Sequence, residues 1–139
     1  MLRSMHRASW GVAVALLLSG CASGIDRMNG ETPLERYSNY AGTPVERFTA
    51  FDINGWTALS RNRLVLWTGV NEAWLVTVWD SCRDLEFADR IRVSRTGSSV
   101  TRFDKIIVGG DRCPISEIRP VDVRQMRADR AAAAGEERK

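Results

Sequence analysis

Ala73-Trp74-Leu75-Val76-Thr77-Val78-Trp79 is the stretch that decides the fold of this chain. Five of its seven residues are β-branched or aromatic, the classes that strands favour. Because successive side chains of a strand point to opposite faces, Trp74, Val76 and Val78 share one face, and Leu75 lies on the other face with Ala73, Thr77 and Trp79. Both faces are largely apolar, so the stretch is predicted to be a buried central strand.

Five further stretches have strand character, and turn residues separate them. They span residues 55–59, 64–68, 90–95, 100–108 and 113–118, with turns expected at 61–63, 69–72, 96–98 and 109–111. Residues 90–95 alternate, which places Ile91 and Val93 inward and the arginines and Ser94 outward. Short strands at this spacing predict a mainly β chain, a small antiparallel barrel or sandwich of about six strands, rather than alternating βαβ units.

Only short segments of the sequence have helical character. Residues 81–89 admit one helical turn, because Leu85 and Ala88 are three apart. Pro120 is predicted to open a final helix, since proline favours the first helical position. Residues 124–134 suit a helix in composition but lack an apolar face, and the end from residue 135 is expected to fray.

A polar segment precedes the predicted strands. Glycines and a proline interrupt residues 22–43, which predicts a disordered tether rather than a long regular element. Tyr37 and Tyr40 are the exception. They indicate either the point where the tether docks on the domain or a short helix over residues 34–40.

The N-terminus has the parts of a signal peptide. Arg3 and Arg7 precede an apolar run that closes at Leu18-Ser19-Gly20-Cys21. The uncharged residues 8–20 number thirteen, too few for a membrane-spanning helix, which takes about 20 apolar residues. An ordinary secretory signal fits less well, because Ser-Gly-Cys precedes Ala22.

The layout resembles the lipobox of bacterial lipoproteins. In that class the cysteine is diacylated and becomes the first mature residue, so the resemblance implies that Cys21 attaches the chain to a membrane through lipid. A residue other than aspartate after the cysteine is associated with transport to the outer membrane. Ala22 therefore implies the inner leaflet of the outer membrane, facing the periplasm.

These signals predict four segments. A lipoprotein signal peptide spans residues 1–20 and a lipidated tether spans 21–43. A β domain follows at 44–120, and a C-terminal helix with a frayed tail occupies 121–139. The 119 residues that remain after processing suffice for one domain.

Composition excludes several kinds of function. His6 is the only histidine and lies in the signal peptide, which excludes Ser-His-Asp or Cys-His catalysis and imidazole-based zinc or copper sites. No catalytic residue, metal or cofactor is expected. Loss of Arg3 and Arg7 on processing lowers the formal net charge from +3 to +1. A nearly neutral chain does not favour a nucleic-acid partner, which needs a patch of one sign.

Two cysteines remain once Cys21 carries lipid. Cys82 and Cys113 would lie in a compartment that permits disulfides, and their spacing is not the C-x-x-C of redox proteins. The sequence therefore predicts a structural disulfide between them. Free or metal-bound thiols are the alternative.

A family resemblance covers roughly residues 37–122. It rests on Trp74-Leu75-Val76, Cys82, Leu85, Ala88, Ile91, Phe103-Asp104, Cys113 and Ile115. These residues resemble an uncharacterised family of small proteobacterial lipoproteins with a cysteine pair. The resemblance implies a domain outline and no active site.

Three sets of residues are candidates for chemistry or binding. The carboxylates Asp80, Asp84, Glu86 and Asp89 surround Cys82, where they form either an acid–base or calcium site or a solvated loop neutralised by Arg83 and Arg90. Lys105 beside Asp104 suits a serine–lysine site or an outward strand position. The tryptophans Trp56, Trp67, Trp74 and Trp79 serve the core unless one of them is an exposed anchor for peptide or glycan.

The sequence favours a non-enzymatic lipoprotein that acts as an interaction or envelope-structural module. Its expected partners are the membrane, through Cys21, and an envelope protein or a glycan. A carboxylate-based envelope enzyme and a carrier of a small apolar ligand are the alternatives. The carrier needs a cavity for which 119 residues leave little room.

Overall fold

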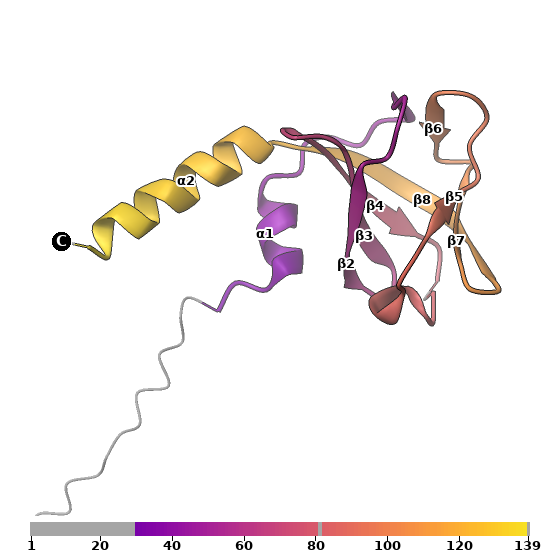
Figure 1. Cartoon of the computed structure of the whole chain (residues 1–139), viewed down its shortest axis with the longest axis horizontal. Coiled ribbons are helices and arrows are strands. Elements are labelled where there is room, and N and C mark those ends of the chain that lie inside the picture. The colour runs from indigo at the N-terminus through magenta and orange to yellow at the C-terminus, as the bar shows by residue number, and fades with distance from the viewer. Residues whose placement is uncertain (1–29, 81, 139) are drawn as a thin grey trace, which may run out of the picture. The chain divides into compact units, whose positions relative to one another are not determined.

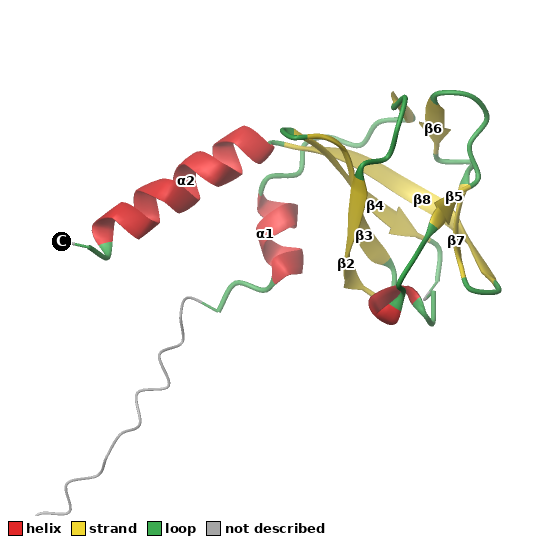
Figure 2. Cartoon of the chain, viewed as in Figure 1, coloured by secondary structure: helices red, strands yellow, loops and turns green. Residues whose placement is uncertain are grey.

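The described chain contains eight strands, which form two antiparallel sheets, and two α-helices (Figures 1 and 2). The structure is a computed structural model that describes residues 30–80 and 82–138. One compact unit begins at Glu31. The predicted signal peptide, Cys21 and the first part of the tether lie outside the described residues. Within residues 30–80 and 82–138, no helix is both long and apolar enough to cross a bilayer.

The larger sheet curls into half a barrel. Its strand order is β2 (Gly55–Ser60), β3 (Arg63–Gly69), β4 (Glu72–Val78), β8 (Asp111–Val121), β7 (Lys105–Val108) and β5 (Arg92–Val93). The smaller sheet pairs β1 (Arg47–Thr49) with β6 (Ser99–Thr101). The prediction of a mainly β, antiparallel chain is confirmed, with eight strands where about six were expected.

Strand β4 is central, as its sequence predicts. It pairs with β3 on one side and with β8 on the other. Val76 and Val78 face an inner core inside the half-barrel, where Leu64, Leu66, Ile106 and Ile118 are also buried. Leu75 and Ala73 face a second core outside the sheet, together with Val65 of β3 and Met126. Burial on both faces explains the nearly unbroken apolar run.

Two strand predictions need correction. Residues 100–108 form two strands, because the Asp104 carboxylate accepts hydrogen bonds from the Thr101 backbone N (2.8 Å) and Oγ1 (2.9 Å) and closes a turn between β6 and β7. Only two residues of 90–95 pair as β5. Arg95, expected to point outward, instead donates to the carbonyl oxygens of Ala50 and Phe51, and these contacts join the loops beside the β1–β6 pair.

Pro120 does not open the final helix. It lies within β8 opposite Trp74, and its carbonyl accepts from the backbone N of Gly42 at 2.8 Å. The strand continues to Val121, and helix α2 (Val123–Glu136) begins after Asp122, whose side chain accepts from the Gln125 N at 2.9 Å. Val123 and Met126 are the buried residues of α2. The prediction that this helix lacks an apolar face is confirmed.

A short helix interrupts the predicted tether. Helix α1 (Pro33–Asn39) has a capping box between Thr32 and Glu35, which confirms the short helix expected near residues 34–40. Tyr37 packs edge-on against Trp67, with ring centroids 6.2 Å apart. Tyr40 Oη donates to Asp129 of α2 at 2.7 Å. The tyrosines therefore do dock this segment on the domain. The expected helical turn after β4 is η1 (Leu85–Phe87).

Removing the cap of α2 should have a small and local effect. Asp122→Ala is expected to destabilise the protein by about 1 kcal/mol, because the first turn of the helix loses its side-chain acceptor. Urea unfolding measures this cost, and amide exchange of residues 123–126 should rise. Asp52→Ala, at an exposed loop aspartate, is the matched control and should leave both quantities unchanged. Equal effects of the two substitutions would contradict the capping role.

Candidate functional site

The predicted disulfide is present. Cys82, in the segment that follows β4, bonds to Cys113 of β8, and their Cα atoms are 6.0 Å apart. Both cysteines are buried in the inner core. Because β4 and β8 are neighbours, the bond ties the loop after the central strand to the strand beside it.

The carboxylates around Cys82 do not converge. Glu86 lies 3.8 Å from Arg61, and Arg83 lies 3.9 Å from Asp111 rather than from the cluster that it was expected to neutralise. Among the described residues, no three side chains of histidine, cysteine, aspartate or glutamate are grouped to hold a metal ion. The arrangement is that of a charged, exposed loop.

Lys105 occupies an outward strand position. Its backbone N donates to Ser94 Oγ at 2.9 Å, so the nearby serine bonds to the main chain of Lys105. The neighbouring Asp104 closes the turn before β7. Ile106 and Val108 are buried and alternate with Lys105 and Ile107, as the sequence predicts.

Of the four candidate tryptophans, three pack against the cores and one does not. Trp56 and Trp74 border the inner core, where Trp74 stacks on Phe48 with ring centroids 4.5 Å apart. Trp67 borders the outer core. Trp79 is 65% exposed at the end of β4. The alternative that one tryptophan is available for binding therefore applies to Trp79.

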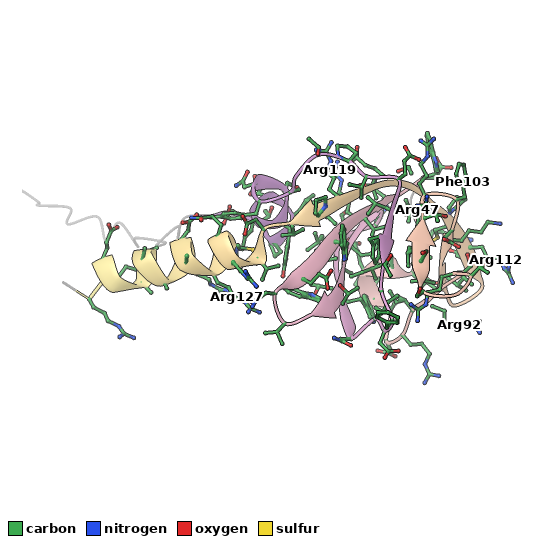
Figure 3. All side chains as sticks on the ribbon, turned by 90° about the horizontal axis from the view of Figure 1, so that it is seen from above. Arg47, Arg92, Phe103, Arg112, Arg119 and Arg127 are labelled. Atoms are coloured by element: carbon green, nitrogen blue, oxygen red, sulfur yellow. A yellow bond between two sulfur atoms is a disulfide. The ribbon has the colours of Figure 1, made fainter. Side chains whose placement is uncertain are left out.

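Four cations gather on the outward face of β5, β7 and β8. Arg92 lies directly opposite Ile107, and Ile107 lies directly opposite Arg112, so the three side chains form one row across three strands. Lys105 is two residues from Ile107 on the same face of β7, and Arg90 precedes β5. We call Arg90, Arg92, Lys105 and Arg112 the cationic face. Figure 3 shows Arg92 and Arg112 at the end of the domain away from α2.

The cationic face borders a shallow groove. Arg90, Ile91, Arg92, Ile107 and Gly109 line a cavity of about 300 Å³. All four cations of the face are exposed. In the described part of the chain, none of their charged groups makes a hydrogen bond or an ion pair with another side chain. They are therefore available to an external anion.

The two carboxylates within the segment that carries this face are engaged in other contacts. Residues 90–112 contain six arginines and lysines but only two carboxylates, Asp104 and Asp111. Asp104 accepts the turn hydrogen bonds from Thr101, and Asp111 is near Arg83. The face thus has an excess of positive charge, although the whole chain is nearly neutral, and one carboxylate, that of Asp84, lies beside Gly109 at the groove. Sequence reasoning missed it because it used the net charge of the chain. The local excess of arginine over residues 90–112 was the available signal.

A second polar groove lies on the outward face of the sheet over β3, β4 and β8. Arg63, Thr77 and Glu117 form a row across β3, β4 and β8, and Arg119 donates to Glu117 from Nε (2.7 Å) and Nη2 (3.1 Å). The hydrogen bonds from Arg119 lower the pKa of Glu117, burial opposes them, and the charges of Arg119 and Arg63 lower it further. With Ser38, Ala41 and Leu75 these side chains line a cavity of about 180 Å³. Arg119 and Glu117 in this groove neutralise each other, unlike the cations of the cationic face.

Comparison with known protein families gives one match. The sequence pattern of a family of unknown function, DUF6491, matches residues 4–137. The chain belongs to this family. The match covers the predicted signal peptide as well as the β domain. No curated protein and no solved structure matches the chain.

Proposed function

We propose that this DUF6491 protein is a lipid-anchored protein of the bacterial outer membrane, facing the periplasm, whose β domain is a non-enzymatic interaction module. The main support for the proposed lipid anchor is the Leu18-Ser19-Gly20-Cys21 sequence at the end of a short apolar run. A disulfide between Cys82 and Cys113 fits an oxidising compartment. The proposed proteobacterial origin rests on the family resemblance of residues 37–122.

The surface of the β domain supports an interaction role. Phe51, Trp79, Phe87 and Phe103 are each between 65% and 85% exposed. Exposed aromatic side chains are frequent anchors at protein interfaces, because they bury much apolar area at a small loss of conformational entropy. An envelope protein or a glycan is the partner that such residues suit.

The two alternative functions have less support. An enzyme that uses the carboxylates near Cys82 would need two of them to face one substrate, whereas Glu86 is near Arg61 and the other three carboxylates are exposed. An apolar carrier would need a hollow inside the half-barrel. The side chains of Leu64, Leu66, Val76 and Ile118 occupy this interior and are 0% exposed.

The intact mass of the protein isolated from its membrane tests the anchor. Processing before Cys21 should remove residues 1–20 and add a thioether-linked diacylglycerol with a third, amide-linked chain. The N-terminal peptide should therefore begin with acylated Cys21. A mass equal to the full 139 residues, or an unmodified N-terminus at any other residue, would contradict the proposal.

A further inference from the structure

We propose that the cationic face of β5, β7 and β8 docks on the anionic phospholipid surface of the membrane that holds the anchor. This inference rests on the proposed lipid anchor. It adds a second, reversible contact that determines how the β domain lies on the membrane.

The charge distribution identifies the kind of partner. Arg92, Lys105 and Arg112 are exposed on three adjacent strands, and Arg90 extends the row beside the groove at Ile107. Directly opposed residues of antiparallel strands have Cβ atoms about 5 Å apart, so Arg92 and Arg112 lie roughly 10 Å from each other across Ile107. Such a spread of charge suits a surface of many phosphates better than one small anion.

The apolar part of the same face also fits a membrane surface. Ile107 lies at the centre of the row, and Pro114 lies opposite Lys105 and is exposed. Phe103, 80% exposed, lies in the turn that leads into β7, with the Arg102 guanidinium 5.3 Å from its ring centroid. Figure 3 shows Phe103 at the same end of the domain as Arg92 and Arg112. Aromatic and arginine side chains together are typical of the interfacial layer of a bilayer.

The tether is long enough for this contact. Nine residues lie between Cys21 and Glu31, where the compact unit begins. The ten steps along the chain from Cys21 to Glu31 span up to about 35 Å, and a domain with a radius of gyration of about 13 Å is roughly 34 Å wide, so the tether length permits the contact when the tether is extended. Since the anchor already holds the domain near the lipid, weak electrostatic attraction is enough to orient it. Each cation near an anionic surface strengthens the attraction about five-fold.

Two fluorescent probes on the lipidated full chain can test the orientation. Gly110, in the turn beside Arg112, and Gly135, in α2, each have open space where a side chain would begin, so Gly110→Cys and Gly135→Cys offer separate labelling sites. Each labelled protein is reconstituted into vesicles of phosphatidylethanolamine with phosphatidylglycerol, or of phosphatidylcholine alone. We expect the Gly110 probe to be shielded from acrylamide quenching only in the anionic vesicles, and the Gly135 probe to be equally quenched in both.

Charge substitutions supply the matched control. Arg92→Gln with Arg112→Gln should abolish the shielding at Gly110. Arg124→Gln with Arg130→Gln makes the same change in net charge at exposed positions of α2 and should preserve it. High salt should also remove the shielding, because it screens exposed charges. Equal quenching in both vesicle types, or equal effects of the two double variants, would overturn the proposal.

The proposed lipid anchor and the proposed docking of the cationic face can be tested separately. If the chain purifies without lipid, the proposed anchor is wrong, and the full chain is instead sedimented with the same anionic vesicles. There the Arg92→Gln, Arg112→Gln variant should bind roughly 30-fold more weakly than the α2 control variant. Binding to duplex DNA that depends on Arg92 and Arg112, without binding to vesicles, would replace the membrane by nucleic acid as the partner.

Discussion

Substitution of Cys113 by serine is expected to lower the free energy of unfolding by about 3–4 kcal/mol, because the bond closes a loop with a sequence separation of 31. This is a large part of the roughly 5–15 kcal/mol that stabilises a typical domain. Cys82 and Cys113 are 1% and 6% exposed, so the variant also buries a serine hydroxyl and an unpaired thiol. Urea unfolding of the wild-type and variant proteins measures the loss.

Alkylation tests the disulfide directly, and a double variant separates the loss of the cross-link from the cost of the buried hydroxyl and thiol. Wild-type protein should react with iodoacetamide at Cys82 and Cys113 only after reduction, whereas Cys113→Ser should leave Cys82 reactive once the protein unfolds. The double variant Cys82→Ala, Cys113→Ala removes the cross-link without burying a hydroxyl or a thiol. It should still lose most of the same stability. Free alkylation of both cysteines in unreduced, folded protein would refute the disulfide.

With the proposed lipid anchor, substitution of Cys21 by alanine is expected to remove membrane attachment completely, since the other two cysteines are bonded to each other in the β domain. The variant should accumulate as the unprocessed chain or as a form without lipid, because the proposal makes Cys21 both the attachment point and the residue at which processing occurs. Several acyl chains hold a protein far more strongly than the single chain that gives only marginal binding. Fractionation of cells with detection of the protein in membrane and soluble fractions measures the effect.

Ser23→Ala is the control for the Cys21 experiment. It alters a small residue close to the anchor and should leave processing and attachment unchanged. If the Cys21→Ala protein appears in the membrane fraction with the normal processed mass, the lipobox assignment is wrong. The fold is not affected by either outcome, because the described domain begins at Glu31.

The local pattern of the sequence predicted the elements well. The apolar alternation of residues 73–79 identified β4 and assigned its side chains to the correct faces. The turns at Gly97 and Gly109 were also predicted, and both glycines adopt positive φ, where a residue without a side chain is favoured. The cysteine pair was identified by elimination, since the sequence analysis predicts lipid attachment at Cys21.

The candidate site was less visible in the sequence. Trp74 and Trp79 belong to the same predicted strand, yet one stacks on Phe48 and the other is exposed just after the strand ends. Strand β1 was not predicted, because it has three residues and only Phe48 among them is buried. The row of Arg92, Ile107 and Arg112 depends on pairing between segments that are up to 20 residues apart.

The sequence by itself determined the central strand, the approximate position of most other strands and the main turns. Those properties follow from side-chain type, backbone preference and the two-residue period of a strand, all of which are local. Only the tertiary structure decided that β8 lies between β4 and β7, and that Arg92, Lys105 and Arg112 meet on one face. Strand order and register arise from backbone hydrogen bonds that any residue can make and from packing between distant segments. No short stretch of sequence therefore encodes them.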